Sequence, residues 1–154
     1  RGDVLVSKCH PVIAFRGKLD TLEAELILCQ LSAEHLVNPV GEVLALARQL
    51  IRCDVLNEPV PEEKLCGLTQ DEIRKRSHFT QEFYGQPHFM PEGKDDLLLL
   101  QINLARAMAR KTELQAVHAF SDREGNPTRL DILQALNRLS SYLYILMIER
   151  KANK

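Results

Sequence analysis

The chain has 154 residues, which is enough for one domain with a sizeable core and too few for two comfortable ones. Its 20 lysines and arginines nearly balance 21 aspartates and glutamates, so the net charge is −1. This balance excludes a global field that would recruit nucleic acid or an anionic membrane, and any anion site must be local.

Other bulk features favour a cytoplasmic protein. No apolar run approaches the ~20 residues of a membrane span, and no signal peptide is visible, so we expect no membrane association. Because the sequence begins at Arg1, we expect a truncated N-terminus. The cysteines lie far apart without a C-x-x-C motif, which predicts reduced, mostly buried thiols: Cys9, Cys29, Cys53 and Cys66.

Helical periodicity recurs from end to end, which predicts an all-α fold. The first helix is expected over about residues 11–36, with one apolar face: Phe15, Leu19, Leu22, Leu26 and Cys29. A second helix should begin at Asn38-Pro39 and run through Ile51, because a cap residue followed by proline is a start signal. Pro59 and Pro61 then break the pattern.

The second half contains a short helix, a long loop and two long helices. Thr69 and Glu72 have capping-box spacing and predict a short helix to about Ser77. Residues 79–96 have no clear period, and their aromatic content favours a functional lid over disorder. Helices over about 95–120 and 131–150 flank a turn at 122–127. Together the sequence predicts four long helices and some shorter elements, which favours an antiparallel bundle in a single domain, 1–154.

The last helix, 131-DILQALNRLSSYLYILMIER-150, is apolar nearly all the way round. It should therefore be covered on more than one side, by its own bundle or also by another subunit. Arg138 lies among these residues, and a partly buried arginine needs a carboxylate, phosphate or carbonyl partner. From this helix alone, an intersubunit salt bridge is the preferred interpretation.

Two arginines share one face of the preceding helix. Arg106 and Arg110 are four residues apart, with Glu113 three further on. Like charges at this spacing repel unless an anion lies between them, and two guanidiniums form a fork for phosphate oxygens. Alternatively, Glu113 and a neighbouring carboxylate neutralise a solvated face. Both interpretations stay open from composition alone.

Other candidate residues are more isolated. Asp20 projects with Ala24, Ile27 and Leu31, so this acid needs a cation, for which Arg106 or Arg138 is available. A di-iron centre is excluded, because no glutamate has a histidine three residues later. No Walker A or Rossmann motif is present. Among the histidines, His88 in the aromatic loop is the best candidate to meet a ligand.

Four stretches together resemble the ATP:corrinoid (cobalamin) adenosyltransferases of the ethanolamine-utilisation type, with the propanediol-utilisation type as a more distant relative. They are 6-VSKCHPVIAFRGKLDTLEAEL-26, 67-GLTQDEIRKRSHF-79, the helix that carries Arg106 and Arg110, and 132-ILQALNRLSSYLYIL-146. The likeness covers most of the chain. It implies a five-helix, up-and-down bundle that forms a homotrimer, with ATP and cobalamin bound between subunits. The implied reaction moves the 5'-deoxyadenosyl group of ATP to Co(I), giving adenosylcobalamin (coenzyme B12).

The resemblance also implies roles for individual residues. Lys8 matches a phosphate-binding lysine, and Asp20 matches an aspartate that pairs with Arg106 across the subunit boundary. The remaining matches are Arg110 on the triphosphate, Glu113, Asn137 and Arg138 in the ATP site, and His88 and Phe89 in a loop, 87-PHFMPEG-93, that covers the corrin. The chain departs from the propanediol type at Val12 and before Val4, where the glycine- and threonine-rich start of the ATP loop is missing.

The implied partners are a reductase and ethanolamine ammonia-lyase, with association with a bacterial microcompartment as a further expectation. Mg²⁺ or another divalent metal stays open, and no residue is assigned as a metal ligand. Two other functions stay in view: a non-catalytic bundle that carries or senses a nucleotide or corrinoid, and a purely structural trimer locked by Asp20 and Arg106.

Overall fold

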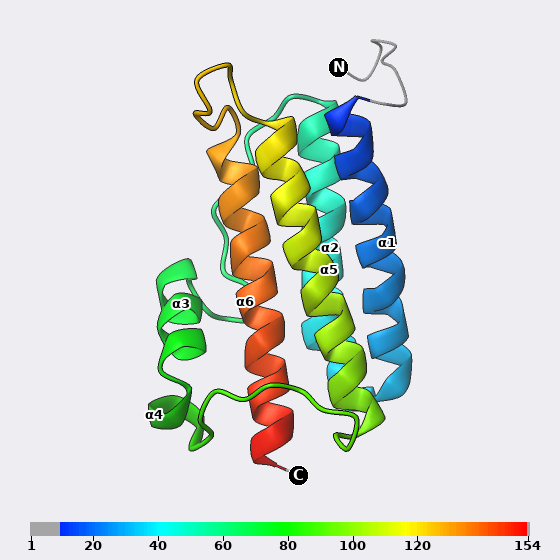
Figure 1. The fold of residues 1–154 in the computed structure, drawn as a ribbon, viewed down its shortest axis with the longest axis vertical. Coiled ribbons are helices and arrows are strands. Elements are labelled where there is room, and N and C mark those ends of the chain that lie inside the picture. Colours follow the sequence, from blue (N-terminus) through cyan, green and yellow to red (C-terminus); the bar gives the residue numbers. More distant parts are fainter. Residues whose placement is uncertain (1–9, 154) are drawn as a thin grey trace.

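The computed structural model describes residues 10–153 and confirms an all-helical fold over that range, apart from two isolated bridges. The long helices run up and down beside one another, and the shorter α3 packs against α6 (Figure 1). Their bounds are α1 Pro11–Ser32, α2 Val37–Val55, α3 Gln70–His78, α5 Leu97–Ala119 and α6 Leu130–Ala152. The short pieces are the 3-10 turn η1 Glu34–Leu36 and helix α4 Thr80–Tyr84.

Helix starts follow from local chemistry. The His10 side chain accepts a hydrogen bond from the Val12 amide at 3.1 Å, and Pro11 occupies the first position of α1. The predicted capping box opens α3: Glu72 N–H donates to the Thr69 hydroxyl at 3.1 Å, and Thr69 N–H donates to the Glu72 carboxylate at 3.2 Å. These reciprocal bonds satisfy amides that the helix itself leaves without partners.

The core lies between the four long helices. The predicted apolar face of α1 is buried, and its Phe15 ring meets Phe120 edge to face at 5.1 Å between ring centroids. From α5, Leu99 and Ile102 enter the same core. Full burial of a leucine or phenylalanine side chain is worth about 1.5–3 kcal/mol, so these inward faces hold the bundle together.

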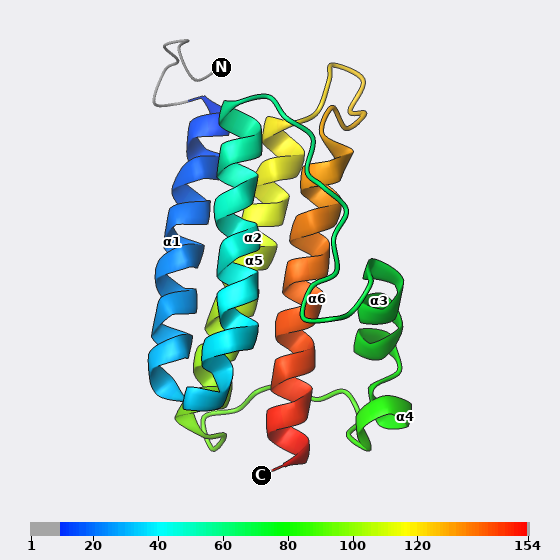
Figure 2. The same ribbon diagram turned by 180° about the vertical axis from the view of Figure 1, so that it is seen from behind.

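Helix α6 is covered on several sides, as predicted, and its own chain supplies the cover. Residues 56–68, called the strap below, descend along α2 and α6 before the chain enters α3 (Figure 2). At the upper end of the strap, the Val60 amide donates to Asp131 at 2.9 Å, and Arg129 donates to the Glu58 carbonyl at 2.7 Å. The strap and α3 thus cover part of this helix from within its own chain.

Three expectations need correction. The first helix ends at Ser32, and the chain continues as η1 up to Leu36. The second begins at Val37 and extends beyond Ile51 to Val55. Residues 79–96 include the helix α4, which Gly85 caps in a left-handed conformation (φ 66°) that suits glycine. None of the helices within residues 10–153 is both long and apolar enough to cross a membrane.

Candidate functional site

A pocket of about 490 Å³ lies between α5 and α6 and contains both arginines of the predicted fork. We call it the arginine pocket. Helix α5 contributes one wall and α6 the other, while Ser77 reaches it from the last turn of α3. Its lining residues are Ser77, Arg106, Arg110, Glu113, Leu114, Val117, Asn137, Ser140, Ser141 and Tyr144.

The charges in this pocket are unbalanced. Arg106 is half-buried, and its Nε donates to Asn103 Oδ1 at 3.0 Å. Burial, and then the positive charge of Arg110, lower the pKa of Arg106, although arginine stays protonated at any pH of interest. Within residues 10–153 neither arginine forms an ion pair. Two such guanidiniums can donate hydrogen bonds to phosphate oxygens. This arrangement favours the predicted phosphate fork over the alternative, in which carboxylates neutralise the two arginines on a solvated face.

Glu113 and Asn137 lie together in the same pocket. The Asn137 amide donates to the Glu113 carboxylate at 3.4 Å, which links α6 to α5. Glu113 is the only carboxylate among the residues that line the pocket, against two guanidiniums. The pocket therefore keeps a net positive charge that an anionic ligand would neutralise.

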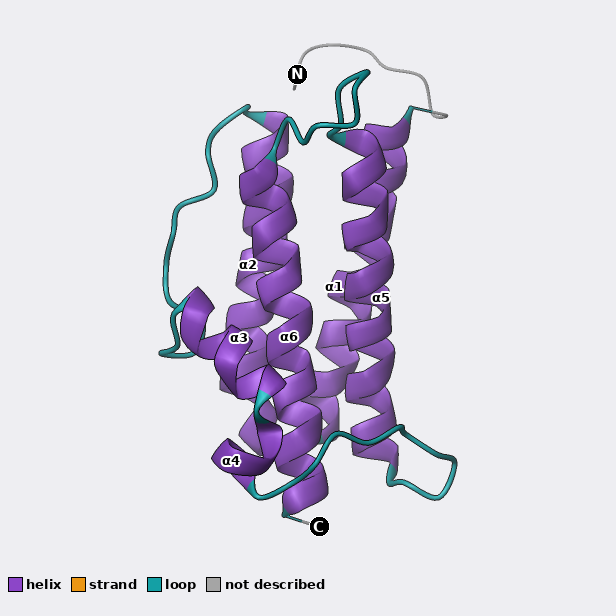
Figure 3. Cartoon of the chain, turned by 60° about the vertical axis from the view of Figure 1, so that its left-hand side comes forward, coloured by secondary structure: helices purple, strands orange, loops and turns teal. Residues whose placement is uncertain are grey.

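His88 and Phe89 lie beside this pocket, in a segment that crosses the C-terminal half of α6 (Figure 3). One ring nitrogen of His88, Nδ1, lies 2.8 Å from the Tyr144 hydroxyl, and the two rings stack with centroids 5.7 Å apart. The half-buried Phe89 ring has Lys151 Nζ 5.1 Å from its centroid. Tyr144 therefore belongs both to the pocket wall and to the anchor of this segment.

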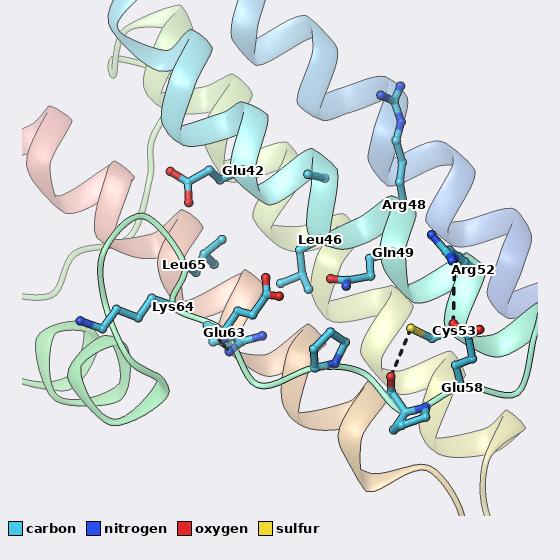
Figure 4. A pocket seen from close by; sticks show the side chains of 14 residues that line it. Glu42, Leu46, Arg48, Gln49, Arg52, Cys53, Glu58, Glu63, Lys64 and Leu65 are labelled. Atoms are coloured by element: carbon cyan, nitrogen blue, oxygen red, sulfur yellow. Dashed lines mark hydrogen bonds and ion pairs between the residues drawn. The ribbon is translucent and has the colours of Figure 1, made fainter.

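Arg138 lies elsewhere. It lines a second cavity, of about 720 Å³. Figure 4 shows this cavity between α2 and the strap. Its side chain is 6% exposed, and Nη1 donates to the Glu63 carbonyl at 2.8 Å, while Nε is buried without a partner among residues 10–153. A backbone carbonyl, one of the three kinds of partner predicted for Arg138, thus accepts one of the hydrogen bonds of its guanidinium.

The electrostatics of this second cavity are mixed. Burial lowers the pKa of Arg138, and the charges of Glu62 and Glu63 oppose that effect. Arg48, Arg52 and Lys64 line the cavity, but so do three glutamates. The structure therefore brings Asn137 together with Arg106 and Arg110 but places Arg138 on another side of α6.

Asp20 does not meet either arginine within the chain. It lies on the outward face of α1, where Leu31 is 80% exposed, so this face is not the core face. In the part of the chain that the structure describes, no ion pair joins Asp20 to Arg106 or Arg138. Lys8 lies outside the described residues.

Several pocket residues were not singled out as site residues from the sequence. Ser141 and Tyr144 share the flank of α6 with Asn137, so a helical projection was the signal that pointed to them. Ser77 comes from α3, which is distant in sequence, and no motif marks it. Among residues 10–153, no group of three or more histidine, cysteine, aspartate or glutamate side chains is placed to hold a metal ion.

These features define a helical bundle whose last two long helices enclose a basic pocket. The chain belongs to the cobalamin adenosyltransferase family: the family model matches residues 2–150. It is 35% identical over 150 residues to the corrinoid adenosyltransferase EutT of Salmonella typhimurium, covering 95% of this chain and 55% of the relative. Identity to EutT of Escherichia coli K12 is 34% over 148 residues, covering 94% and 54%.

The chain spans about half the length of the curated relatives that it matches. No solved structure matches it at a significant level. The family and its fold are thereby shown, in agreement with the resemblance seen in the sequence.

Proposed function

We propose that this chain transfers the 5'-deoxyadenosyl group of ATP to the Co(I) ion of a corrinoid, with adenosylcobalamin and inorganic triphosphate as products. The observation that carries the proposal is the arginine pocket, in which two guanidiniums without ion pairs among residues 10–153 face one carboxylate, in a chain that belongs to this family. In the reaction, a cobalt lone pair forms the new bond to C5' of the ribose. The C5'–O bond breaks, its electrons leave with triphosphate, and cobalt goes from Co(I) to Co(III).

Each pocket residue has a physical role in this proposal. Arg110, an exposed residue of the pocket lining, binds the triphosphate and stabilises the negative charge that grows on the leaving oxygen. Asn137 and Glu113 form the hydrogen-bonded part of the nucleotide site. Most of the rate enhancement then comes from positioning and electrostatics, since Co(I) is itself a strong nucleophile.

The proposal includes a homotrimer with Asp20 of one subunit paired to Arg106 of the next. Two neighbouring helices, α1 and α5, support it by presenting large apolar side chains outward: Leu28 53%, Leu31 80%, Leu97 71%, Leu104 55% and Leu114 72% exposed. Exposed leucines on two adjacent helices supply apolar surface that a subunit interface would bury. Such an interface would bury Asp20 next to a cation.

The remaining parts of the proposal concern the corrinoid and its context. His88 and Phe89 belong to the segment assigned to the corrin, and Arg138 and Lys8 stay assigned to the nucleotide by resemblance. A divalent metal such as Mg²⁺ would arrive with the triphosphate, and Glu113 is the one carboxylate among the described residues that line the pocket. A reductase supplies the electron, ethanolamine ammonia-lyase receives the product, and the site of action is the cytoplasm or a bacterial microcompartment.

The test is an anaerobic reaction of the chain with ATP and chemically reduced cob(I)alamin, followed by absorbance. Light-sensitive adenosylcobalamin that forms at a rate proportional to protein concentration is the expected result. ATP binding without any product would instead favour the nucleotide carrier or sensor. No ATP binding at all would favour the structural trimer.

A further inference from the structure

His88 makes two polar contacts that fix which tautomer its neutral ring adopts. Its Nε2 lies 2.8 Å from the backbone carbonyl of His78, the last residue of α3. Because a carbonyl oxygen only accepts, Nε2 must carry the hydrogen. In the neutral ring Nδ1 then holds the lone pair, and the Tyr144 hydroxyl, 2.8 Å away, donates to it.

Tyr144 also forms part of the wall of the arginine pocket. It is half-buried on α6 and lines the pocket together with Arg106 and Ser77. Burial raises the pKa of Tyr144, while a backbone hydrogen bond at Phe89 and the charge of Arg106 oppose that rise. One side chain thus meets the pocket and two consecutive residues of the segment beside it.

We propose that Tyr144 is a positioning residue whose hydroxyl occupies the Nδ1 lone pair of His88 and so holds residues 85–93 against the wall of the arginine pocket. The other end of the segment has independent anchors. Lys151 pairs with the buried Asp95 at 2.7 Å, and Arg150 pairs with Asp96 at 2.6 Å. Loss of the Tyr144 hydroxyl should therefore free the His88 end and leave the fold intact.

One consequence rests on the proposed function. While Tyr144 and the His78 carbonyl engage both ring nitrogens, His88 has no lone pair to offer to cobalt. The His88 ring then does not supply a lower ligand. Tyr144 would also be the residue through which the nucleotide pocket and the corrinoid segment contact each other.

The test compares Tyr144→Phe with Tyr84→Phe, a matched loss of a hydroxyl on α4. The first readout is the ¹⁵N resonance of His88 Nδ1 in the full chain without substrates, which is shifted upfield when this nitrogen accepts a hydrogen bond. We expect Tyr144→Phe to remove that shift and Tyr84→Phe to retain it. An unchanged resonance in Tyr144→Phe, or a protonated Nδ1 in the unmodified protein, would overturn the proposal.

The second readout is steady-state kinetics with cobalamin and ATP. Tyr144→Phe should raise the corrinoid KM about 2- to 10-fold, the loss expected for one neutral hydrogen bond, and Tyr84→Phe should leave it within about twofold of the unmodified value. No change in Tyr144→Phe, or an equal rise in Tyr84→Phe, would contradict a positioning role. The NMR readout needs no activity, so failure of the proposed reaction and failure of this proposal are distinguishable.

A third measurement addresses cobalt directly. Cob(II)inamide, a corrinoid without a nitrogen base of its own, is bound to the unmodified protein and examined by electron paramagnetic resonance. We expect no nitrogen splitting of the cobalt signal. A three-line nitrogen splitting that disappears in His88→Ala would show that His88 approaches cobalt and would overturn the proposal.

Discussion

Removal of Arg110 should weaken ATP binding and at the same time slightly stabilise the protein without ligand. Arg110 lies one helical turn from Arg106 on α5, and its charge helps to lower the pKa of Arg106. Arg110→Gln removes that repulsion and keeps a side chain of similar helix propensity. Relief of an i,i+4 like-charge pair is worth a few tenths of a kcal/mol, or about 1 °C in Tm for a chain of this size.

The loss of ligand binding should be much larger. A hydrogen bond between charged groups contributes about 1.5–3 kcal/mol, so its removal weakens binding about 10- to 150-fold. If ATP is present at 100 times the Kd of the unmodified protein, it stabilises that protein by about 2.7 kcal/mol. The same concentration should stabilise Arg110→Gln by only about 0.3–1.4 kcal/mol.

The assay is thermal unfolding with and without ATP, with Lys111→Gln as the control. Lys111 is the exposed neighbour of Arg110 on α5, does not line the pocket, and loses the same charge when changed. Lys111→Gln should retain nearly the full shift with ATP. The assignment of Arg110 to phosphate would be refuted if ATP stabilised Arg110→Gln as much as the unmodified protein. It would also be refuted if Lys111→Gln lost as much ATP stabilisation as Arg110→Gln.

Three further predictions concern stability and thiol reactivity. Asp131→Asn should lower the free energy of unfolding by about 2–3 kcal/mol in urea titrations, because Asp131 holds the strap and pairs with Arg129, which is only 12% exposed. Burial opposes ionisation of Asp131, but the bonds from Arg129 and the Val60 amide lower its pKa overall. The contribution of Asp131 to stability should therefore be complete above about pH 5 and fade as the pH falls below ~4. A difference in unfolding free energy between the unmodified protein and Asp131→Asn that grows in acid would contradict this. Thr69→Ala should cost about 1 kcal/mol and speed amide exchange at the start of α3, and unchanged exchange there would count against the capping box. Burial of Cys29 and partial burial of Cys66 raise the pKa of both thiols to about 11. Mass spectrometry should therefore find both nearly unlabelled by iodoacetamide at pH 8 in the folded protein, and rapid labelling would contradict these raised pKa values.

The helices were predictable because their signals are local. The apolar face of α1, the capping box at Thr69 and the turn before α6 each depend on residues within a few positions of one another. Helix α4 was missed because five residues carry too little periodicity to be recognised. The strap was equally hidden, since its contacts with Asp131 and Arg129 join residues about seventy positions apart.

The candidate site was predictable in part for the same reason. Arg106, Arg110 and Glu113 share a helical face, so their meeting in one pocket followed from spacing. Asn137 and Arg138 are adjacent in sequence, but neighbours on a helix point about 100° apart, and only Asn137 reaches that pocket. Asp20 illustrates the remaining limit. The sequence places this acid beside apolar residues, but helical periodicity alone does not tell whether that face meets the core or lies exposed, as it does on α1.

The most direct test of the central claim follows the carbon atom that is transferred. The chain is incubated anaerobically with reduced cob(I)alamin and ATP labelled with ¹³C at the ribose 5' position, and the products are examined by NMR. The proposed reaction predicts the label in a carbon bonded to cobalt, with one inorganic triphosphate released per labelled product. Label that stays in ATP, or appears only in ADP or AMP while cobalamin is unchanged, would contradict it.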